Sequence, residues 1–143
     1  MSSRIYFDTA PIIYFLDKSP LYYTKMRDFI FRNINDESQF YTSVLIDMEY
    51  LVFPYKNADF QKVNQYKVFI KDLNFKQIDI SSEICDFAAK LRAEYDFLKQ
   101  MDALHLSCCI YFDCDFFVTN DRQLLKVTEI KPLFVDDFKD DVL

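Results

Sequence analysis

Apolar and polar positions alternate along the chain with two different periods, and the changes between them predict an ordered series of strands and helices. Short apolar or β-branched runs bounded by polar residues are typical of strands. Longer stretches with apolar residues three or four positions apart are typical of amphipathic helices. Five predicted strands follow, the third weaker than the others: Arg4–Phe7, Gln39–Thr42, Phe75–Ile80, Asp115–Thr119 and Pro132–Val135.

Helical segments are predicted between these strands. Pro11 suits the first turn of a helix that continues through IIYFL. Ser43 is a good cap for a helix carrying Glu49, and Pro54 is expected to end or bend that helix. The remaining predicted helices cover Leu21–Phe31, Ala58–Leu73, Ser81 or Ser82 through Tyr95, Met101–Phe112 and a short turn at Asp121–Lys126.

Strands that alternate with helices predict an α/β fold with a central, mostly parallel sheet and helices on both faces. A chain of 143 residues corresponds to about one domain, and no linker or repeat divides it, so residues 1–143 are interpreted as a single domain. The apolar content of 51%, with 16 Phe and 10 Tyr, supports a packed core.

The composition excludes several classes of function. The chain contains no glycine, whereas phosphate-binding loops and dinucleotide fingerprints need glycine where the backbone approaches a phosphate. A P-loop NTPase or a Rossmann dehydrogenase is therefore excluded, and turns are expected to use Asn, Asp, Pro and Ser. The net charge of −6 argues against nucleic-acid binding through bulk electrostatics. This net charge is compatible with a local site at which bound cations reverse the charge.

The expected location is the cytoplasm. No apolar run approaches the roughly 20 residues of a membrane helix, and the start MSSRIYFDTA lacks the pattern of a signal peptide. The four cysteines, Cys85, Cys108, Cys109 and Cys114, show neither a CxxC pair nor zinc-ligand spacing. They are interpreted as reduced, structural thiols.

Two acids stand directly beyond predicted strands. Asp8 follows the strand run IYF, and Asp121 follows FFVT with one Asn between. In open α/β sheets, ligands bind beyond the carboxyl ends of the strands. If the two strands are central neighbours, both carboxylates converge there. The alternative is that each acid only caps a helix, which Asp does well.

Glu49 and Asp102 are less clear from their local sequence. Glu49 lies among apolar residues, where a carboxylate needs a partner, a raised pKa or a cation. Asp47 competes for that role, but the two side chains point to nearly opposite sides of a helix. Asp102 opens the apolar run ALHLSCCIYF and either caps a helix or faces the sheet end.

Three stretches of the chain, in order, extend these observations: DTAPIIYFL, SVLIDMEYLV and KQMDALHLSCCIYFDCDFFVTNDRQLL. They resemble the PIN-domain nucleases, above all the single-domain VapC-type toxins. The resemblance covers nearly the whole chain, with DALHL and FFVTND as its strongest parts and the Glu49 segment as its weakest. The sequence departs from the family pattern in having FDCD where a glycine usually precedes the fourth strand.

The resemblance implies a PIN-like fold and a set of site residues. It places the metal-binding, catalytic acids at Asp8, Glu49, Asp102 and Asp121. Thr119 and Asn120 complete the TND signature, and Thr9 or Ser43 supports the shell around the acids. Carboxylates packed together repel one another, and hard oxygen ligands suit Mg²⁺ or Mn²⁺. One or two such ions would activate a water that cleaves an RNA phosphodiester and leaves a 5′-phosphate.

The resemblance also implies partners. A VapC-type toxin is restrained by a small antitoxin, which would insert a basic side chain among the carboxylates. The segments Ile12–Leu16 and Leu21–Ile30 are candidates for the antitoxin groove and for a homodimer face, or their aromatic residues are simply core. Arg122 and Lys126 could contact phosphate or be solvated.

Other interpretations remain open at this level. His105, the only histidine, follows Asp102 by three residues; a hydrogen-bonded core role is favoured over catalysis. One of Asp113 and Asp115 is interpreted as a turn residue, with a place in the metal shell as the alternative. A haloacid-dehalogenase-like phosphatase would need an acid at position 10, where Ala10 stands. The remaining alternatives are a PIN fold kept as an idle interaction module and a PIN nuclease of RNA processing without an antitoxin.

Overall fold

The computed structural model describes residues 2–139 of the protein. Its centre is a sheet of five strands in the order β3-β2-β1-β4-β5, and every neighbouring pair is parallel. The prediction of an α/β fold with a parallel sheet is confirmed. The strands are β1 (Arg4–Phe7), β2 (Gln39–Ser43), β3 (Lys76–Ile78), β4 (Phe116–Thr119) and β5 (Pro132–Phe134).

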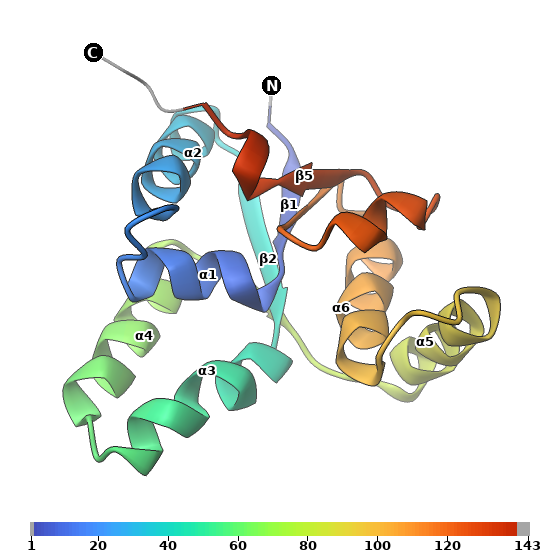
Figure 1. The fold of residues 1–143 in the computed structure, drawn as a ribbon, viewed down its shortest axis with the longest axis horizontal. Helices are drawn as coiled ribbons and strands as arrows, with labels where there is room; N and C mark the ends of the chain where they lie inside the picture. Colours follow the sequence, from blue (N-terminus) through green and yellow to red (C-terminus); the bar gives the residue numbers. More distant parts are fainter. Residues whose placement is uncertain (1, 140–143) are drawn as a thin grey trace.

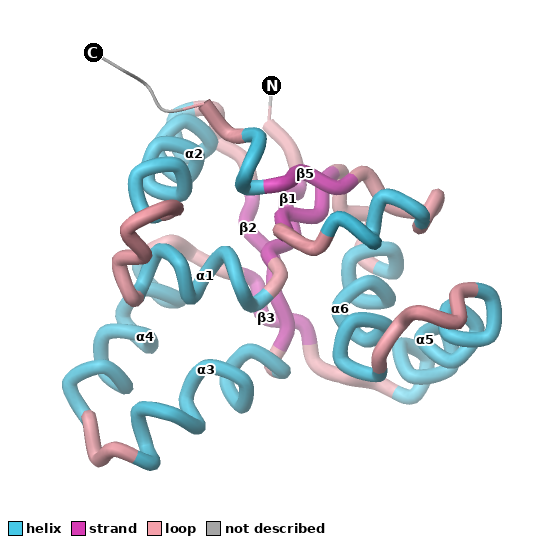
Figure 2. Tube along the Cα trace, in the orientation of Figure 1, coloured by secondary structure: helices cyan, strands magenta, loops and turns pink. Residues whose placement is uncertain are grey.

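Helices cover both faces of the sheet, as predicted (Figures 1 and 2). Helices α1 to α4 lie on one side, where Phe7, Phe40 and Val118 point into the first apolar core. Helices α5 and α6 lie on the other, over Tyr6 and Phe117. The helices are α1 (Thr9–Leu16), α2 (Tyr23–Asn35), α3 (Leu45–Lys56), α4 (Phe60–Asp72), α5 (Ser82–Glu94) and α6 (Gln100–Tyr111), with 3₁₀ turns η1 (Arg122–Lys126) and η2 (Val135–Asp137).

The central strands β1 and β4 are direct neighbours, and this places the ends that carry acids side by side. Phe7 is paired with Val118 in the register of the two strands. The backbone N–H of Asp8 extends the pairing, because it donates to the carbonyl of Val118 at 2.9 Å. The chain therefore leaves both strands at the same edge of the sheet.

Two helices run past the ends expected from the sequence, and other boundaries shift by one or two residues. Helix α2 begins at Tyr23 and continues to Asn35, past the predicted end at Phe31. Pro54, expected to end or bend its helix, does not end α3, which runs on to Lys56 with Pro54 in its last turn. Proline has no N–H to donate to the carbonyl four residues earlier, so α3 lacks that hydrogen bond.

Five helices end in a left-handed residue although the chain contains no glycine. Each of these residues has φ between 49° and 59° and stands directly after a helix C-cap. After Ala58, for example, the N–H of Asp59 bonds to the carbonyl of Pro54 at 2.8 Å, which satisfies a free carbonyl of the last turn. Asn74 and Asp113 fit the expected turn residues, but the other three do not: Lys18, Glu37 and Ala58.

Within residues 2–139, no helix combines the length and the apolar character needed to cross a membrane.

Candidate active site

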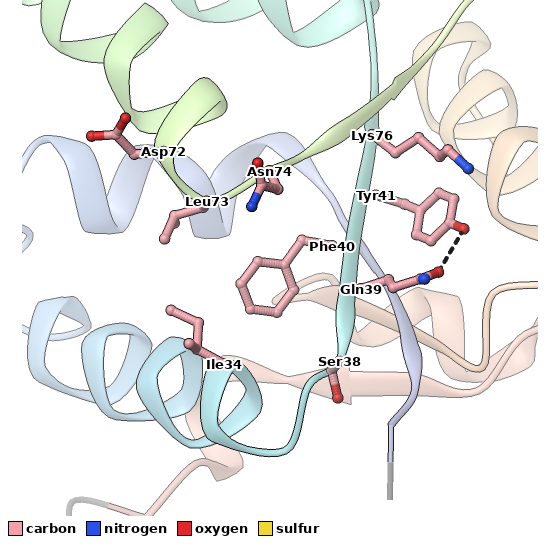
Figure 3. A pocket seen from close by; sticks show the side chains of 9 residues that line it. All are labelled: Ile34, Ser38, Gln39, Phe40, Tyr41, Asp72, Leu73, Asn74 and Lys76. Atoms are coloured by element: carbon pink, nitrogen blue, oxygen red, sulfur yellow. Dashed lines mark hydrogen bonds between the residues drawn. The ribbon is translucent and has the colours of Figure 1, made fainter.

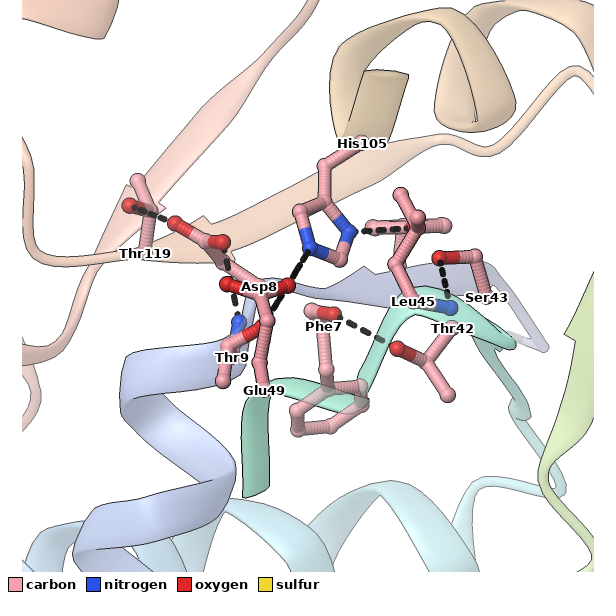
Figure 4. A network of polar contacts seen from close by, with 10 residues as sticks. Phe7, Asp8, Thr9, Thr42, Ser43, Leu45, Glu49, His105 and Thr119 are labelled. Atoms are coloured by element: carbon pink, nitrogen blue, oxygen red, sulfur yellow. Dashed lines mark hydrogen bonds and ion pairs between the residues drawn. The ribbon is translucent and has the colours of Figure 1, made fainter. Parts of the chain in front are cut away.

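Asp8 lies at the carboxyl end of β1 and is held through both carboxylate oxygens. Oδ1 accepts from the backbone N–H of Thr9 at 2.9 Å and caps α1, while Oδ2 accepts from the hydroxyl of Thr119 at 2.9 Å (Figure 4). Burial, and to a lesser extent the charge of Glu49, raise the pKa of Asp8, against the opposing effects of His105, Thr9 and Thr119. The capping role and the place at the sheet end thus coexist in one residue.

Asp121 lies two residues beyond β4, at the same edge of the sheet. Its backbone N–H donates to the hydroxyl of Thr119 at 3.2 Å, and its Oδ1 accepts from the N–H of Gln123 at 3.1 Å, which caps η1. The side chain is exposed. Asp121 therefore also combines capping with a position near Asp8.

Asp102 lies in the first turn of α6 and does not cap it, because Lys99 occupies the cap position. Burial raises the pKa of Asp102, and the negative charges of Asp8 and Asp121 raise it further. The three aspartates from β1, α6 and β4 thus interact electrostatically at one end of the sheet. Their mutual repulsion is the arrangement that a bound cation would relieve.

Glu49, on α3, is held by hydrogen bonds from two side chains. Its Oε1 accepts from the hydroxyl of Thr9 at 2.9 Å and from Nε2 of His105 at 2.7 Å (Figure 4). Burial raises the pKa of Glu49, but the hydrogen bond and charge of His105, with the Thr9 bond, bring it below the ordinary value. Asp47 faces elsewhere and accepts from the hydroxyl of Tyr66 at 2.6 Å, so of the two acids Glu49 is the one at the site.

His105 lies beside two of the candidate site residues, Glu49 and Thr9. It is a buried, hydrogen-bonded group, as expected, yet its partners belong to the site: Nε2 contacts Glu49 and, at 3.2 Å, Thr9. The spacing from Asp102 was the available signal, since residues three apart share one side of a helix.

Ser43 and Asn120, which the resemblance also implies, make hydrogen bonds to backbone groups. The hydroxyl of Ser43 accepts from the N–H of Leu45 at 3.3 Å at the start of α3, although Val44 occupies the cap position. The side chain of Asn120 is bonded to other groups: its Oδ1 accepts from the N–H of Asp136 at 3.0 Å, and its amide donates to the hydroxyl of Tyr14 at 3.5 Å.

The two basic candidates for phosphate contact have partners of their own. Arg122 makes a two-point contact with Asp137, at 3.0 and 2.7 Å, and lies over the ring of Phe134. Lys126 lies over the ring of Phe97, 5.5 Å from its centre.

Asp113 and Asp115 do not join the shell. Asp113 is a left-handed turn residue, and Asp115 accepts from the N–H of Arg4 at 2.7 Å, at the opposite end of β1 and β4 from Asp8. A pocket of about 440 Å³ lies away from the candidate acids, beside the first residues of β2 and β3, with Phe40 and Asn74 in its wall (Figure 3).

The donor chemistry of the four acids fits a hard divalent cation, because all their side-chain donors are carboxylate oxygens. Over residues 2–139, however, no three His, Cys, Asp or Glu side chains already stand as a metal-ligand group. Glu49 is bonded to His105, Asp8 to Thr119 and Thr9, and Asp121 to the N–H of Gln123. The residues that would hold a divalent cation are thus Asp8, Glu49, Asp102 and Asp121, whose side chains are not gathered as a ligand set in this structure.

A model of the PIN domain family matches residues 5–130. The chain belongs to the PIN domain family. PIN domains are nucleases, and the family generally uses divalent metal ions. No curated protein matches the chain.

Two solved structures share the fold of this PIN domain. One is VapBC2 from Rickettsia felis bound to a DNA fragment from their promoter, with 18% identity and a TM-score of 0.73, over 92% of this chain and 98% of that chain. The other is a toxin-antitoxin complex from Klebsiella pneumoniae, with 19% identity and a TM-score of 0.70, over 92% of this chain and 97% of that chain.

Proposed function

We propose that this PIN domain is a Mg²⁺- or Mn²⁺-dependent endoribonuclease. The observation that carries the proposal is the position of Asp8, Asp102 and Asp121 at the carboxyl end of the parallel sheet. Thr119 contacts both Asp8 and Asp121, and the pKa of Asp102 is raised first by burial and then by the charges of Asp8 and Asp121. A carboxylate cluster of this kind is suited to bind a divalent cation, and a cation there offsets the repulsion that a phosphodiester would otherwise meet.

The chain's own groups would each have a defined part. Asp8, Asp102 and Asp121, with Glu49, would hold one or two ions. When bound, the metal would supply an acidified water and stabilise charge on the scissile phosphate. Thr119 and Thr9 orient the carboxylates of Asp8 and Glu49 by the hydrogen bonds described above.

Titration calorimetry with Mn²⁺ tests this proposal against an idle PIN fold. Wild-type protein should bind Mn²⁺, and Asp8→Asn should bind it at least ~100-fold more weakly, since even outer-shell changes cost 10–100-fold. Asn also caps helices well, so the variant should keep its fold. Equal binding by both proteins, or none by the wild type, would favour the interaction-module alternative.

We also propose that the protein is the toxin of a toxin–antitoxin pair, restrained by a small antitoxin. Two proteins of the same fold, VapBC2 of Rickettsia felis and the toxin-antitoxin complex of Klebsiella pneumoniae, support this proposal. A cavity of about 220 Å³ between α1 and α3 reaches Glu49 and is lined also by Ile13, Tyr50 and Phe53. A basic side chain of an antitoxin could enter there and pair with the carboxylate of Glu49.

Exposed apolar side chains on the helices near this cavity are further candidates for the contact surface. In the two segments predicted for this role, Ile12, Phe29 and Ile30 are buried, whereas Leu21 is exposed and residues 13–16 are half-buried. Apolar side chains are also exposed on α3 and at the start of α4, and this patch is a further candidate for the antitoxin or a homodimer face: Met48, Val52, Phe53, Tyr55 and Phe60.

Expression in a bacterial host tests the toxin role. The wild type should slow growth, and Asp8→Asn should not. A wild type that is harmless at high expression and monomeric by light scattering would remove the toxin proposal. It would leave an RNA-processing nuclease without an antitoxin as the alternative.

A further inference from the structure

Glu49 differs from the three aspartates in how it is fixed. It comes from α3, and two hydrogen bonds, from Thr9 and from His105, reach the same carboxylate oxygen, Oε1. Among residues 2–139, no donor is bonded to Oε2. One oxygen therefore holds the side chain in place, and the other is the one available to a cation.

The imidazole of His105 is itself fixed from its far side. Nδ1 lies 2.7 Å from the hydroxyl oxygen of Tyr6, whose ring stacks on Phe117 with centres 5.4 Å apart. Both Tyr6 and His105 are buried. Because the Glu49 carboxylate accepts, Nε2 donates to it, and Nδ1 shares a hydrogen bond with the hydroxyl of Tyr6.

This orientation joins two elements of the site that are distant in sequence. His105 lies one turn after Asp102 on α6, and it contacts Glu49 on α3. The contact sets the position of Glu49 relative to the helix that carries Asp102. Backbone carbonyls could satisfy a purely structural histidine, whereas both nitrogens here contact side chains, those of Tyr6, Glu49 and Thr9.

We infer that His105 is a positioning residue of the metal site: it holds Oε1 of Glu49, with Tyr6 as its support, so that Oε2 remains free to bind a cation. The inference rests on the proposed metal-dependent nuclease function. Hydrogen-bonding partners of ligating carboxylates contribute to metal affinity in this way, and their loss typically costs 10–100-fold.

Three substitutions separate positioning from simple packing. In His105→Gln the amide nitrogen can take the place of Nε2 and donate to Glu49. In His105→Asn the shorter amide reaches only the place of Nδ1, and His105→Leu keeps volume but no polar group. Ser107→Ala is the matched control, since Ser107 is buried on the same helix and donates to the carbonyl of Ile84 at 2.7 Å, away from the acids.

The readouts are Mn²⁺ affinity by calorimetry, RNA cleavage and the free energy of unfolding without metal. We expect His105→Leu and His105→Asn to lose about 10–100-fold in Mn²⁺ affinity and in cleavage. His105→Gln should recover most of both. Ser107→Ala should change unfolding but neither metal affinity nor cleavage.

Two results would overturn the inference while leaving the nuclease proposal intact. One is wild-type Mn²⁺ affinity and cleavage in a folded His105→Asn or His105→Leu. The other is a His105→Gln variant that loses as much affinity as His105→Asn at equal stability. If His105→Leu does not fold, the comparison of Gln with Asn still decides. A wild type that binds no Mn²⁺ would contradict the nuclease proposal and the inference together.

Discussion

The hydroxyl of Thr119 donates to Oδ2 of Asp8 at 2.9 Å and so links the ends of two neighbouring strands. The hydroxyl oxygen of Thr119 also accepts from the backbone N–H of Asp121, at 3.2 Å. One buried hydroxyl thus fixes two of the candidate metal ligands, one by its side chain and one by its backbone. The threonine of the TND segment is in this way part of the site's framework.

Thr119→Val should weaken both stability and activity. Valine keeps the shape but leaves the Asp121 N–H without its acceptor and Asp8 without its donor, at a cost of about 1–3 kcal/mol in unfolding free energy. Cleavage should fall by ~10–100-fold, as for other partners of ligating groups. Denaturant unfolding and RNA cleavage assays measure the two effects.

Thr119→Ser is the control, because it keeps the hydroxyl and should retain most of the activity. A Val variant as active as the Ser variant would show that this hydroxyl is unimportant to the site.

Asp102→Asn should stabilise the metal-free protein at neutral pH. The pKa of Asp102 is raised in the folded state, mainly by burial and then by the charges of Asp8 and Asp121. The folded protein therefore binds more protons than the unfolded chain, and stability falls as pH rises from the usual Asp pKa of about 3.9 to the raised value. Below that pH range the Asp102 carboxyl is protonated in both the folded and the unfolded state, so it does not lower the stability of the protein.

Denaturant unfolding in EDTA at several pH values measures this effect. The stability advantage of Asp102→Asn over the wild type should be absent at the acid end and present at pH 7. Mn²⁺ should remove it by stabilising only the wild type. An Asp102→Asn variant less stable than the wild type at pH 7 in EDTA would contradict the electrostatic account.

Ala58→Gly should stabilise the protein by about 0.5–1 kcal/mol. Ala58 has φ of 49° after α3, a conformation that costs an L-residue about 1–2 kcal/mol and glycine almost nothing. The flexibility of glycine in the unfolded chain offsets part of the gain.

The same change inside a helix provides the matched control for Ala58. Ala89 is exposed within α5, and Ala89→Gly should lower the unfolding free energy by about 0.5–1 kcal/mol. Thermal or denaturant unfolding would show the two opposite signs. A destabilised Ala58→Gly variant would mean that the left-handed conformation does not form in solution.

The sequence allowed the fold and two of the acids to be located because their signals are local. Asp8 and Asp121 follow short apolar strands, and parallel strands end at one edge. The hydrogen bond between His105 and Glu49 spans 56 positions and depends on how α6 meets α3 across the sheet end, so no local pattern contains it. The left-handed conformation of Lys18 could not be predicted from the residue type either, because the surrounding structure determines it.

The most direct test of the central claim is cleavage of a labelled single-stranded RNA by the purified protein with Mg²⁺ or Mn²⁺. The account predicts endonucleolytic products with 5′-phosphate ends, formed by the wild type with metal and abolished by EDTA or by Asp8→Asn. The end group also guards against contamination, because metal-independent ribonucleases that use the 2′-hydroxyl leave a 5′-hydroxyl. Cleavage that persists in EDTA, or equally in Asp8→Asn, would contradict the proposed metal-dependent nuclease.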